Sequence, residues 1–185
     1  MKGEQIMTTN TKPRIAAVIY EDGAALNQVF SEVVESLRSR GTRLSGVIQN
    51  AKPNHTPGKS ACCGGLGLED LSLGEDLTVS QDLGEGAEDC HLDANALAQV
   101  AKSLTNQLSE PDLSVDLFII NRFGQSETEG HGMFDVFSEV VMQEIPLLTA
   151  VKKDHLASWE NWHGGIAHSL AHDKNDILEW CLADS

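Results

Sequence analysis

The order of apolar and polar positions along the chain predicts strands and helices that alternate. Four short apolar runs have the length and composition of strands buried on both faces; they span residues 15–20, 44–49, 115–120 and 147–151. Between the first two runs, apolar residues recur at steps of three and four. This spacing predicts a helix capped by Asp22 and ended by Gly41. A strand, a helix and a strand in this order favour a right-handed parallel unit, so the pattern predicts an α/β fold.

Two kinds of segment interrupt this alternation. Residues 68–71 and 77–81 alternate apolar and polar positions, which predicts a β-hairpin insertion with one solvated face. Residues 50–67 are rich in glycine and proline, and residues 82–89 are acidic with two glycines. Both of these segments are expected to be loops.

The length of the chain favours one domain. At 185 residues it can build a single α/β core, and it has no linker that would separate two domains. Residues 1–13 are polar and aperiodic, so we expect a disordered tail followed by one domain at 14–185. The expected architecture is three-layered, with a mainly parallel sheet between helices.

The central strand is expected at residues 115–120, and polar residues and glycines follow it. Ligands of open α/β sheets bind beyond the carboxyl ends of the strands. The polar side chains at this position are Asn121, Arg122, Glu127, Glu129 and His131. The sequence therefore predicts the functional site in the segment that follows this strand.

The composition argues against several classes of function. The chain has 13 Lys and Arg against 28 Asp and Glu, a formal net charge of −15, which repels nucleic acids and anionic membrane surfaces. Its apolar runs are shorter than the roughly 20 residues of a membrane span, and its start lacks the apolar core of a secretory signal. We therefore expect a cytoplasmic protein. In that compartment its four cysteines are free thiols or metal ligands.

The turn after the first strand does not have the residues of a phosphate-binding loop. Such a loop needs several glycines and a lysine that contacts the β- and γ-phosphates. Residues 20–26 contain Glu21 and Asp22, one glycine and no lysine. At the end of the central strand, Asn121 and Arg122 stand where an NTPase would place a metal-binding acid. The sequence thus has an NTPase-like order of elements but lacks both catalytic parts, the phosphate-binding loop and the metal-binding acid.

Several motifs resemble those of a proteobacterial family of unknown function. They are residues 121–124 (Asn-Arg-Phe-Gly), Glu127, Glu129-Gly130, Gly132, residues 145–151 (Ile-Pro-Leu-Leu-Thr-Ala-Val), residues 79–84 and residues 90–93. The family is often encoded near molybdate transport genes and is distantly similar to small P-loop nucleoside-triphosphatases. The resemblance covers nearly all of residues 15–180, and it implies a P-loop NTPase-like fold and a molybdenum-related context. The family usually has a lysine in place of Gln125 and an arginine in place of His131.

Three groups of residues could carry chemistry. An oxyanion could bind to Arg122 with the side chains and backbone amides around it; the candidate residues are Ser80, Gln81, Asn121, Arg122, Gly124, Glu127, Glu129, Gly130 and Gly132. Alternatively, Arg122 pairs with Glu127 or Glu129 and only holds the loop. A soft or borderline metal could bind to Cys62, Cys63, Cys90 and His91, although adjacent cysteines do not match the usual zinc spacing. Glu127, Glu129 and His131 could form an acid/base or hard-metal site, or a solvated loop.

The function we expect from these residues is non-enzymatic. The chain would be an accessory protein that binds a small ligand, a metal or an oxyanion. The resemblance extends this expectation to molybdenum handling, with molybdate or a soft transition metal as the ligand. One alternative is a divergent nucleotide-dependent phosphotransferase or hydrolase. A further alternative is a homodimeric scaffold or interaction protein.

Overall fold

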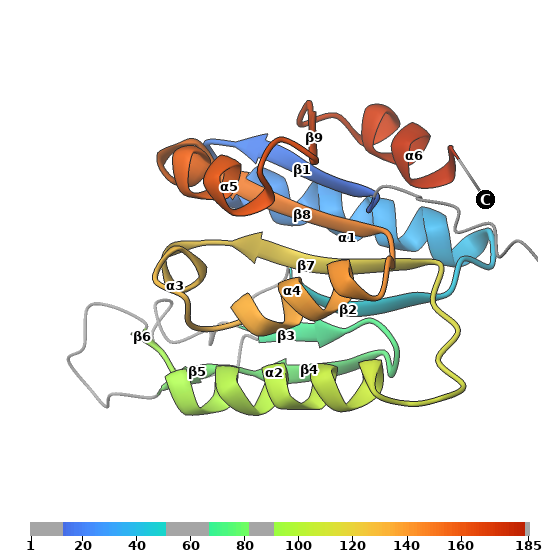
Figure 1. Ribbon diagram of the computed structural model, residues 1–185. Coiled ribbons are helices and arrows are strands. Elements are labelled where there is room, and N and C mark those ends of the chain that lie inside the picture. The colour runs from blue at the N-terminus through green and yellow to red at the C-terminus, as the bar shows by residue number, and fades with distance from the viewer. Residues whose placement is uncertain (1–12, 51–66, 82–90, 184–185) are drawn as a thin grey trace, which may run out of the picture.

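The computed structural model describes residues 13–50, 67–81 and 91–183, and the structural statements below refer to these ranges. A sheet of seven strands lies between two layers of helices (Figure 1). The strands of this sheet are β1 (Ile15–Tyr20), β2 (Leu44–Gln49), β3 (Gly67–Asp70), β4 (Glu75–Thr78), β7 (Leu117–Phe123), β8 (Leu147–Lys152) and β9 (His168–Leu170). The helices are α1 (Gly23–Ser39), α2 (Ala94–Leu108), α3 (Gln125–Thr128), α4 (Phe134–Met142), α5 (Leu156–His163) and α6 (Lys174–Leu182), with a short 3₁₀ turn at Lys153–His155.

The order of the strands is β4-β3-β2-β7-β8-β1-β9, which places β7 at the centre of the sheet. Strands β2, β7, β8, β1 and β9 pair in parallel, whereas β3 and β4 pair antiparallel at one edge. The prediction of a three-layer α/β fold with a mainly parallel sheet is confirmed. The predicted hairpin is also present, but it extends the edge of the main sheet and makes that sheet mixed.

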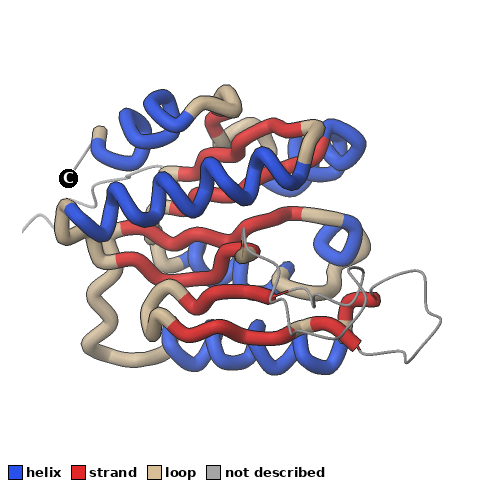
Figure 2. Tube along the Cα trace, turned by 180° about the vertical axis from the view of Figure 1, so that it is seen from behind, coloured by secondary structure: helices blue, strands red, loops and turns tan. Residues whose placement is uncertain are grey.

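Each face of the sheet has its own hydrophobic core. Side chains of α2, α4 and α5 pack against one face, and those of α1 and α6 pack against the other. Figure 2 shows helices on both sides of the sheet. Strand β7 serves both cores, because Phe118 and Ile120 belong to the first and Leu117 and Ile119 to the second. This alternation is what a central strand covered on both faces requires.

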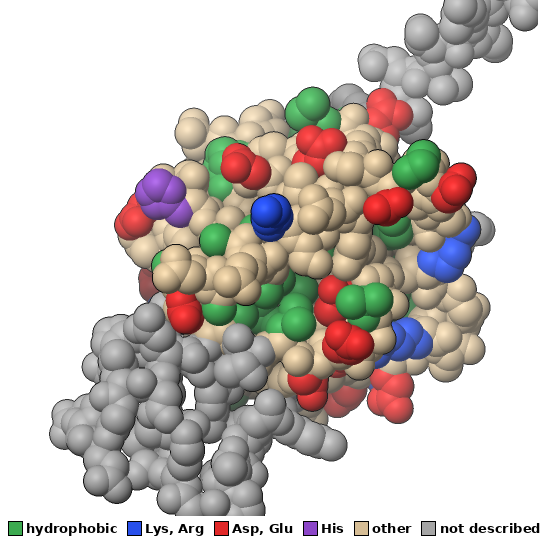
Figure 3. Space-filling model, turned by 90° about the horizontal axis from the view of Figure 1, so that it is seen from below, with side chains coloured by type: hydrophobic (Ala, Val, Ile, Leu, Met, Phe, Trp, Pro, Cys, Tyr) green, Lys and Arg blue, Asp and Glu red, His purple; other side chains and the backbone are tan. Residues whose placement is uncertain are grey.

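The surface beside α2 and β4 is strongly acidic. Figure 3 shows this side of the molecule, with acidic side chains spread over it and few Lys or Arg among them. A hollow on the same side exposes hydrophobic side chains. None of the helices in the described ranges has the length and apolar character needed to cross a membrane.

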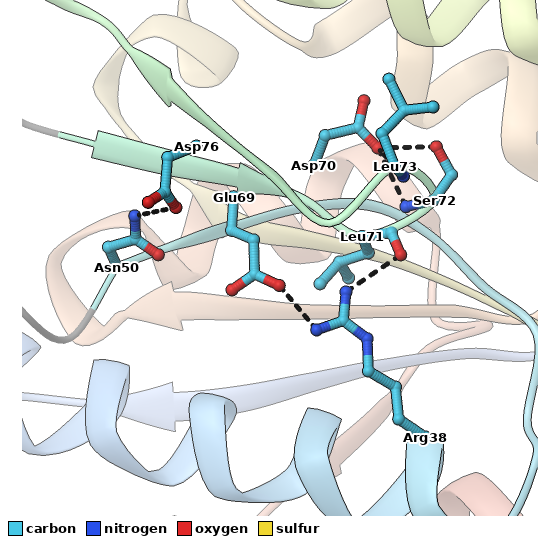
Figure 4. Close-up of polar contacts among 8 residues, drawn as sticks. All are labelled: Arg38, Asn50, Glu69, Asp70, Leu71, Ser72, Leu73 and Asp76. Atoms are coloured by element: carbon cyan, nitrogen blue, oxygen red, sulfur yellow. Dashed lines mark hydrogen bonds and ion pairs between the residues drawn. The ribbon is translucent and has the colours of Figure 1, made fainter.

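The edge hairpin forms hydrogen bonds with both layers of helices, and Figure 4 shows its contacts with Arg38 of α1. Asp70 is buried at the end of β3, and one of its carboxylate oxygens accepts hydrogen bonds from the hydroxyl and backbone N–H of Ser72, at 2.6 and 2.9 Å. Its other oxygen accepts from Gln107 of α2 at 3.1 Å. On the opposite layer, Arg38 of α1 pairs with Glu69 at 2.6 Å. The hairpin is therefore an integral part of the fold.

Several predicted boundaries differ from the structure. The hairpin turn lies at residues 71–74, and Ser80–Gln81 leaves the main sheet as β5 to pair with β6 (His91–Leu92). The central strand continues to Phe123, because Asn121 and Arg122 still form part of the strand. Nearly all of the predicted tail (1–13) and loops (50–67 and 82–89) lies outside the described residues.

Gly46 allows β2 to lie against the central strand. It has a φ of +103°, and a Cβ at this position would overlap the backbone carbonyl oxygen of Ile119. Backbone atoms of a central strand cannot move aside as a flexible side chain would. This position therefore requires glycine for two reasons, conformation and space.

We predict that Gly46→Ala lowers the free energy of unfolding by at least about 3 kcal/mol, through strain added to overlap. Gly41→Ala is the control: Gly41 has a φ of +81° with no atom within 4 Å of the added Cβ. It should cost only about 1 kcal/mol. Urea denaturation of both variants measures the difference, and equal losses would contradict the proposed overlap.

Candidate functional site

A cavity of about 610 Å³ lies at the carboxyl ends of β2 and β7, beside the start of α1. Four of its polar side chains come from α1, β2 and β7; they are Asn27, Gln49, Asn121 and Arg122. The rest of its lining includes six apolar side chains, those of Val47, Leu68, Val79, Leu97, Ile120 and Met133. This position, beyond the carboxyl ends of parallel strands, is where α/β folds place their ligands.

An irregularity in β7 turns two consecutive side chains toward the same helix. Ile120 pairs with Thr149 and Phe123 with Val151, so β7 uses three steps where β8 uses two. In a regular strand, neighbouring side chains point to opposite faces. Here Asn121 and Arg122 both form hydrogen bonds with Asn27 of α1. The extra residue acts as a β-bulge, which re-aims side chains at the end of a strand.

Arg122 is held by three neutral oxygen atoms. Its guanidinium donates to the hydroxyl of Tyr20 at 2.9 Å, to Oδ1 of Asn27 at 3.2 Å and to Oε1 of Gln49 at 2.6 Å. It also lies over the ring of Tyr20, with Cζ 5.2 Å from the ring centroid. No described carboxylate forms an ion pair with it. The positive charge at the cavity wall therefore has hydrogen bonds but no counter-ion in the described chain.

The guanidinium also fixes how two amides are oriented. Because Arg122 can only donate, Asn27 must present its oxygen to it. That same oxygen accepts from Nδ2 of Asn121 at 3.3 Å. The side-chain oxygen of Asn121, Oδ1, consequently points away from Asn27. It is buried without a hydrogen-bond partner in the described structure. A buried acceptor left in this way costs free energy unless a further donor reaches it.

The start of α1 carries its own anion. The carboxylate of Asp22 accepts hydrogen bonds from the backbone N–H groups of Ala24 and Ala25, at 2.8 and 3.3 Å. The predicted cap is therefore confirmed. Free N–H groups at a helix start are what a phosphate-binding loop offers to a phosphate, and here a side chain of the protein occupies them. Glu21 pairs with Lys153, and their hydrogen bond lowers the pKa of Glu21 below its ordinary value.

Glu127 holds the loop that follows β7. It is buried, and its two carboxylate oxygens accept from the backbone N–H groups of Gly124 and Met133, both at 2.9 Å. Gly132, with a φ of +63°, leaves the room that this carboxylate fills. The interpretation in which Arg122 pairs with Glu127 or Glu129 is wrong, because Glu127 binds backbone amides and Glu129 accepts from Gln125.

The other predicted site residues are placed as follows. Of the predicted oxyanion set, Asn121, Arg122, Gly124 and Glu127 line the cavity. Glu129, Gly130 and His131 are exposed and are not part of its lining. Ser80 and Gln81 form β5, and the structure describes only their backbone. The oxyanion site therefore stays a prediction, and the residues that support it are those around Arg122.

The predicted metal site lies almost entirely outside the described residues. This holds for Cys62, Cys63 and Cys90, and only the backbone of His91 is described, in β6. Within the described ranges, no group of three His, Cys, Asp or Glu side chains could hold a metal ion. Cys181 of α6 is buried in the core that α1 and α6 form with the sheet. This burial raises the pKa of its thiol to about 12. The metal site therefore stays a prediction.

Sequence reasoning missed the partners of Arg122. Tyr20 and Gln49 are the last residues of β1 and β2, so the rule that parallel strands end at one edge could have placed them beside it. Asn27 is a polar residue next to the apolar stripe of α1, and it is only 8% exposed. A polar side chain beside such a stripe was the available signal.

The structure is a three-layer α/β fold similar to that of P-loop NTPases. At the start of α1, where such a fold would hold its phosphate loop, the backbone amides are bound by the carboxylate of Asp22. The model of the family described as "Protein of unknown function (DUF2478)" matches residues 15–180, and the chain belongs to that family. The family and the NTPase-like relationship agree with the resemblance found in the motifs. The expected neighbourhood of molybdate transport genes stays an expectation.

The chain is similar to two known proteins, and it spans only a small part of the first. The molybdenum import ATP-binding protein ModC 2 of Bradyrhizobium diazoefficiens is 31% identical over 168 residues, which are 90% of this chain but 18% of that protein. The solution structure of a human cancer-related nucleoside triphosphatase has a TM-score of 0.61 at 14% identity, covering 93% of this chain and 99% of that one. At that identity the likeness shows the fold alone.

We predict that Glu127→Gln lowers the free energy of unfolding by about 2 kcal/mol. An amide can accept from only one of the two N–H groups, and its own N–H₂ then faces the other. Glu129→Gln is the matched control, and its effect should stay within about 0.5 kcal/mol because Glu129 is exposed. Urea denaturation tests both, and a neutral Glu127→Gln would refute a structural role for this carboxylate.

Proposed function

We propose that the protein binds a small anionic ligand at Arg122 and does not hydrolyse nucleoside triphosphates. The observation that carries this proposal is the partly buried guanidinium at the cavity wall, whose partners among the described residues are all neutral. Removing a charge from water without a counter-ion costs free energy. In a chain with a net charge of −15, carboxylates are plentiful, yet none of the described ones pairs with this arginine. An anion from solution would supply the missing charge.

The described partners of the guanidinium do not use all of its hydrogen-bond donors. It carries five N–H groups, and Tyr20, Asn27 and Gln49 take three of them, so two have no partner among the described residues and can bind a ligand. Charge-assisted hydrogen bonds of this kind are stronger than neutral ones. The three neutral residues hold the side chain in place before a ligand arrives, which reduces the entropy lost on binding.

The carboxyl end of the sheet, where this cavity lies, is unsuited to binding a triphosphate. Catalysis of phosphoryl transfer needs a lysine and a metal ion on the β- and γ-phosphates. Instead, Asp22 occupies the amides at the start of α1, and β7 ends in Asn121 and Arg122. A polyphosphate would meet the Asp22 carboxylate at the helix start, and Arg122 is the only basic side chain among the described residues of the cavity lining. We therefore place the protein among ligand-binding relatives of the NTPases.

Molybdate is the first ligand to test. The name of the relative from Bradyrhizobium states a role in molybdenum import, and molybdate is a small oxyanion of the kind that a guanidinium binds. Because the chain spans 18% of that protein, its activity does not transfer directly. The name supports the choice of probe, and the geometry at Arg122 supports the choice of an anion.

We predict that molybdate, tungstate or sulfate stabilises the protein through Arg122. At a concentration one hundred times the Kd, a bound anion adds about 2.7 kcal/mol, or about 5 to 10 °C in Tm. Arg122→Gln should lose this shift, measured against its own ligand-free Tm. Arg40→Gln, an exposed arginine at the far end of α1, should retain it. A shift that survives in Arg122→Gln would contradict the proposal.

Gln49→Glu should replace the ligand with an internal counter-ion. The new carboxylate can keep the 2.6 Å hydrogen bond to Arg122 while it neutralises the guanidinium. We expect the free energy of unfolding to rise by about 1 kcal/mol and the anion-induced Tm shift to disappear. Differential scanning calorimetry with and without the anion measures both. An unchanged shift would show that the positive charge is not the binding determinant.

A second candidate is a divergent nucleotide hydrolase, and the fold likeness to the human nucleoside triphosphatase favours it. Our account predicts no phosphate release from ATP or GTP with Mg²⁺ above the rate in buffer. Phosphate detection under turnover conditions tests this. Release that persists in the purified protein and is lost in Arg122→Gln would overturn the non-enzymatic proposal and place hydrolysis in this cavity.

A further inference from the structure

The cavity has two ends of different character. At one end Arg122, Asn27 and the start of α1 form a polar wall. At the other end the wall is made by Val79 and Leu97, which belong to the core between the sheet and α2. The cavity thus passes from the layer of α1 to the layer of α2 around the carboxyl end of the sheet. A ligand that fills it would need a polar group at one end and an apolar body at the other.

The size of the cavity separates inorganic from organic anions. If each oxygen takes the volume of a water molecule, about 30 Å³, a tetrahedral oxyanion fills roughly 120 Å³. The cavity measures about 610 Å³, so such an ion would leave most of it empty. Pockets of this size with mainly apolar walls are typical of sites for organic molecules.

The charge of the site favours a monoanion. Arg122 supplies one positive charge, and among the described residues of the lining the other ionisable side chain is that of Glu127. A phosphate monoester carries between one and a half and two negative charges at neutral pH, and molybdate, tungstate and sulfate are dianions as well. These charges exceed what one guanidinium balances, so such anions should bind at Arg122 more weakly than a carboxylate that also fills the cavity. A carboxylate carries a single charge and accepts hydrogen bonds from a guanidinium in a favourable geometry.

We propose that the cavity binds an amphipathic organic carboxylate, with its carboxylate on Arg122 and its aliphatic or aromatic body toward the partly exposed Leu97 at the apolar end. This inference rests on the proposed function and names the class of ligand for the same site. The three residues around the guanidinium orient the head group, and the apolar wall provides most of the contact area. Affinity should therefore depend on both ends of the ligand.

Isothermal titration calorimetry with matched compounds tests the proposal. The probes are molybdate, benzoate, naphthoate, naphthylmethanol and naphthyl phosphate. Burial of a second aromatic ring should make naphthoate bind about tenfold more tightly than benzoate. Naphthylmethanol, which lacks the charge, should bind at least about tenfold more weakly than naphthoate, and naphthyl phosphate should also bind more weakly.

Two variants assign the binding to the two ends of the cavity. Gln49→Glu should weaken naphthoate by at least about tenfold, and it tests the head group even if Arg122→Gln fails to fold. Leu97→Trp should remove the advantage of naphthoate over benzoate because the larger side chain fills the apolar end. Leu73→Trp, at an exposed leucine outside the cavity, should keep that advantage.

The outcomes separate this inference from the proposed function. If molybdate binds through Arg122 but naphthoate is no tighter than benzoate, anion binding stands and the organic ligand is refuted. If naphthyl phosphate binds more tightly than naphthoate, the proposed preference of the site for a monoanion is refuted. If none of the anions binds, both proposals fail.

Discussion

One extra residue in β7 sets the direction of Arg122, and the candidate site depends on it. In a regular strand, Asn121 and Arg122 would face opposite layers of helices. The irregularity between Ile120 and Phe123 lets both of them reach Asn27. Phe123 then returns to the other layer, where its ring packs edge-to-face on those of Phe137 and Trp159. A strand buried on both faces thus carries a charged group to the edge of the sheet on a rigid support.

The electrostatics at the carboxyl end of the sheet depend on the hydrogen bonds that its acidic side chains already accept. Asp22 satisfies the start of α1, and Glu127 satisfies the amides of Gly124 and Met133. Each carboxylate has its own backbone donors, so neither neutralises Arg122. The fold is similar to that of a nucleoside triphosphatase, but the charges at two positions differ from those of a phosphate-binding NTPase site. The helix start that would hold phosphate is closed, and the strand end that would hold a metal carries a positive charge.

The sequence predicted those features that depend on local patterns. The apolar runs gave the four parallel strands, the helical spacing gave α1 with its Asp22 cap, and the alternation at residues 68–81 gave the hairpin. The bulge could not be predicted, because it is defined by the pairing of β7 with β8 and not by β7 alone. The ring of acceptors around Arg122 could not be derived either. Tyr20, Asn27 and Gln49 come from three elements, and only the folded sheet brings them together.

Anomalous diffraction from a crystal soaked in tungstate shows most directly where an anion binds to this protein. Our account predicts a peak within hydrogen-bonding distance of the Arg122 guanidinium, with the Asp22 carboxylate still on the amides of Ala24 and Ala25. A peak at the start of α1, with Asp22 displaced from those amides, would contradict it, because the phosphate-loop position would then be the working site.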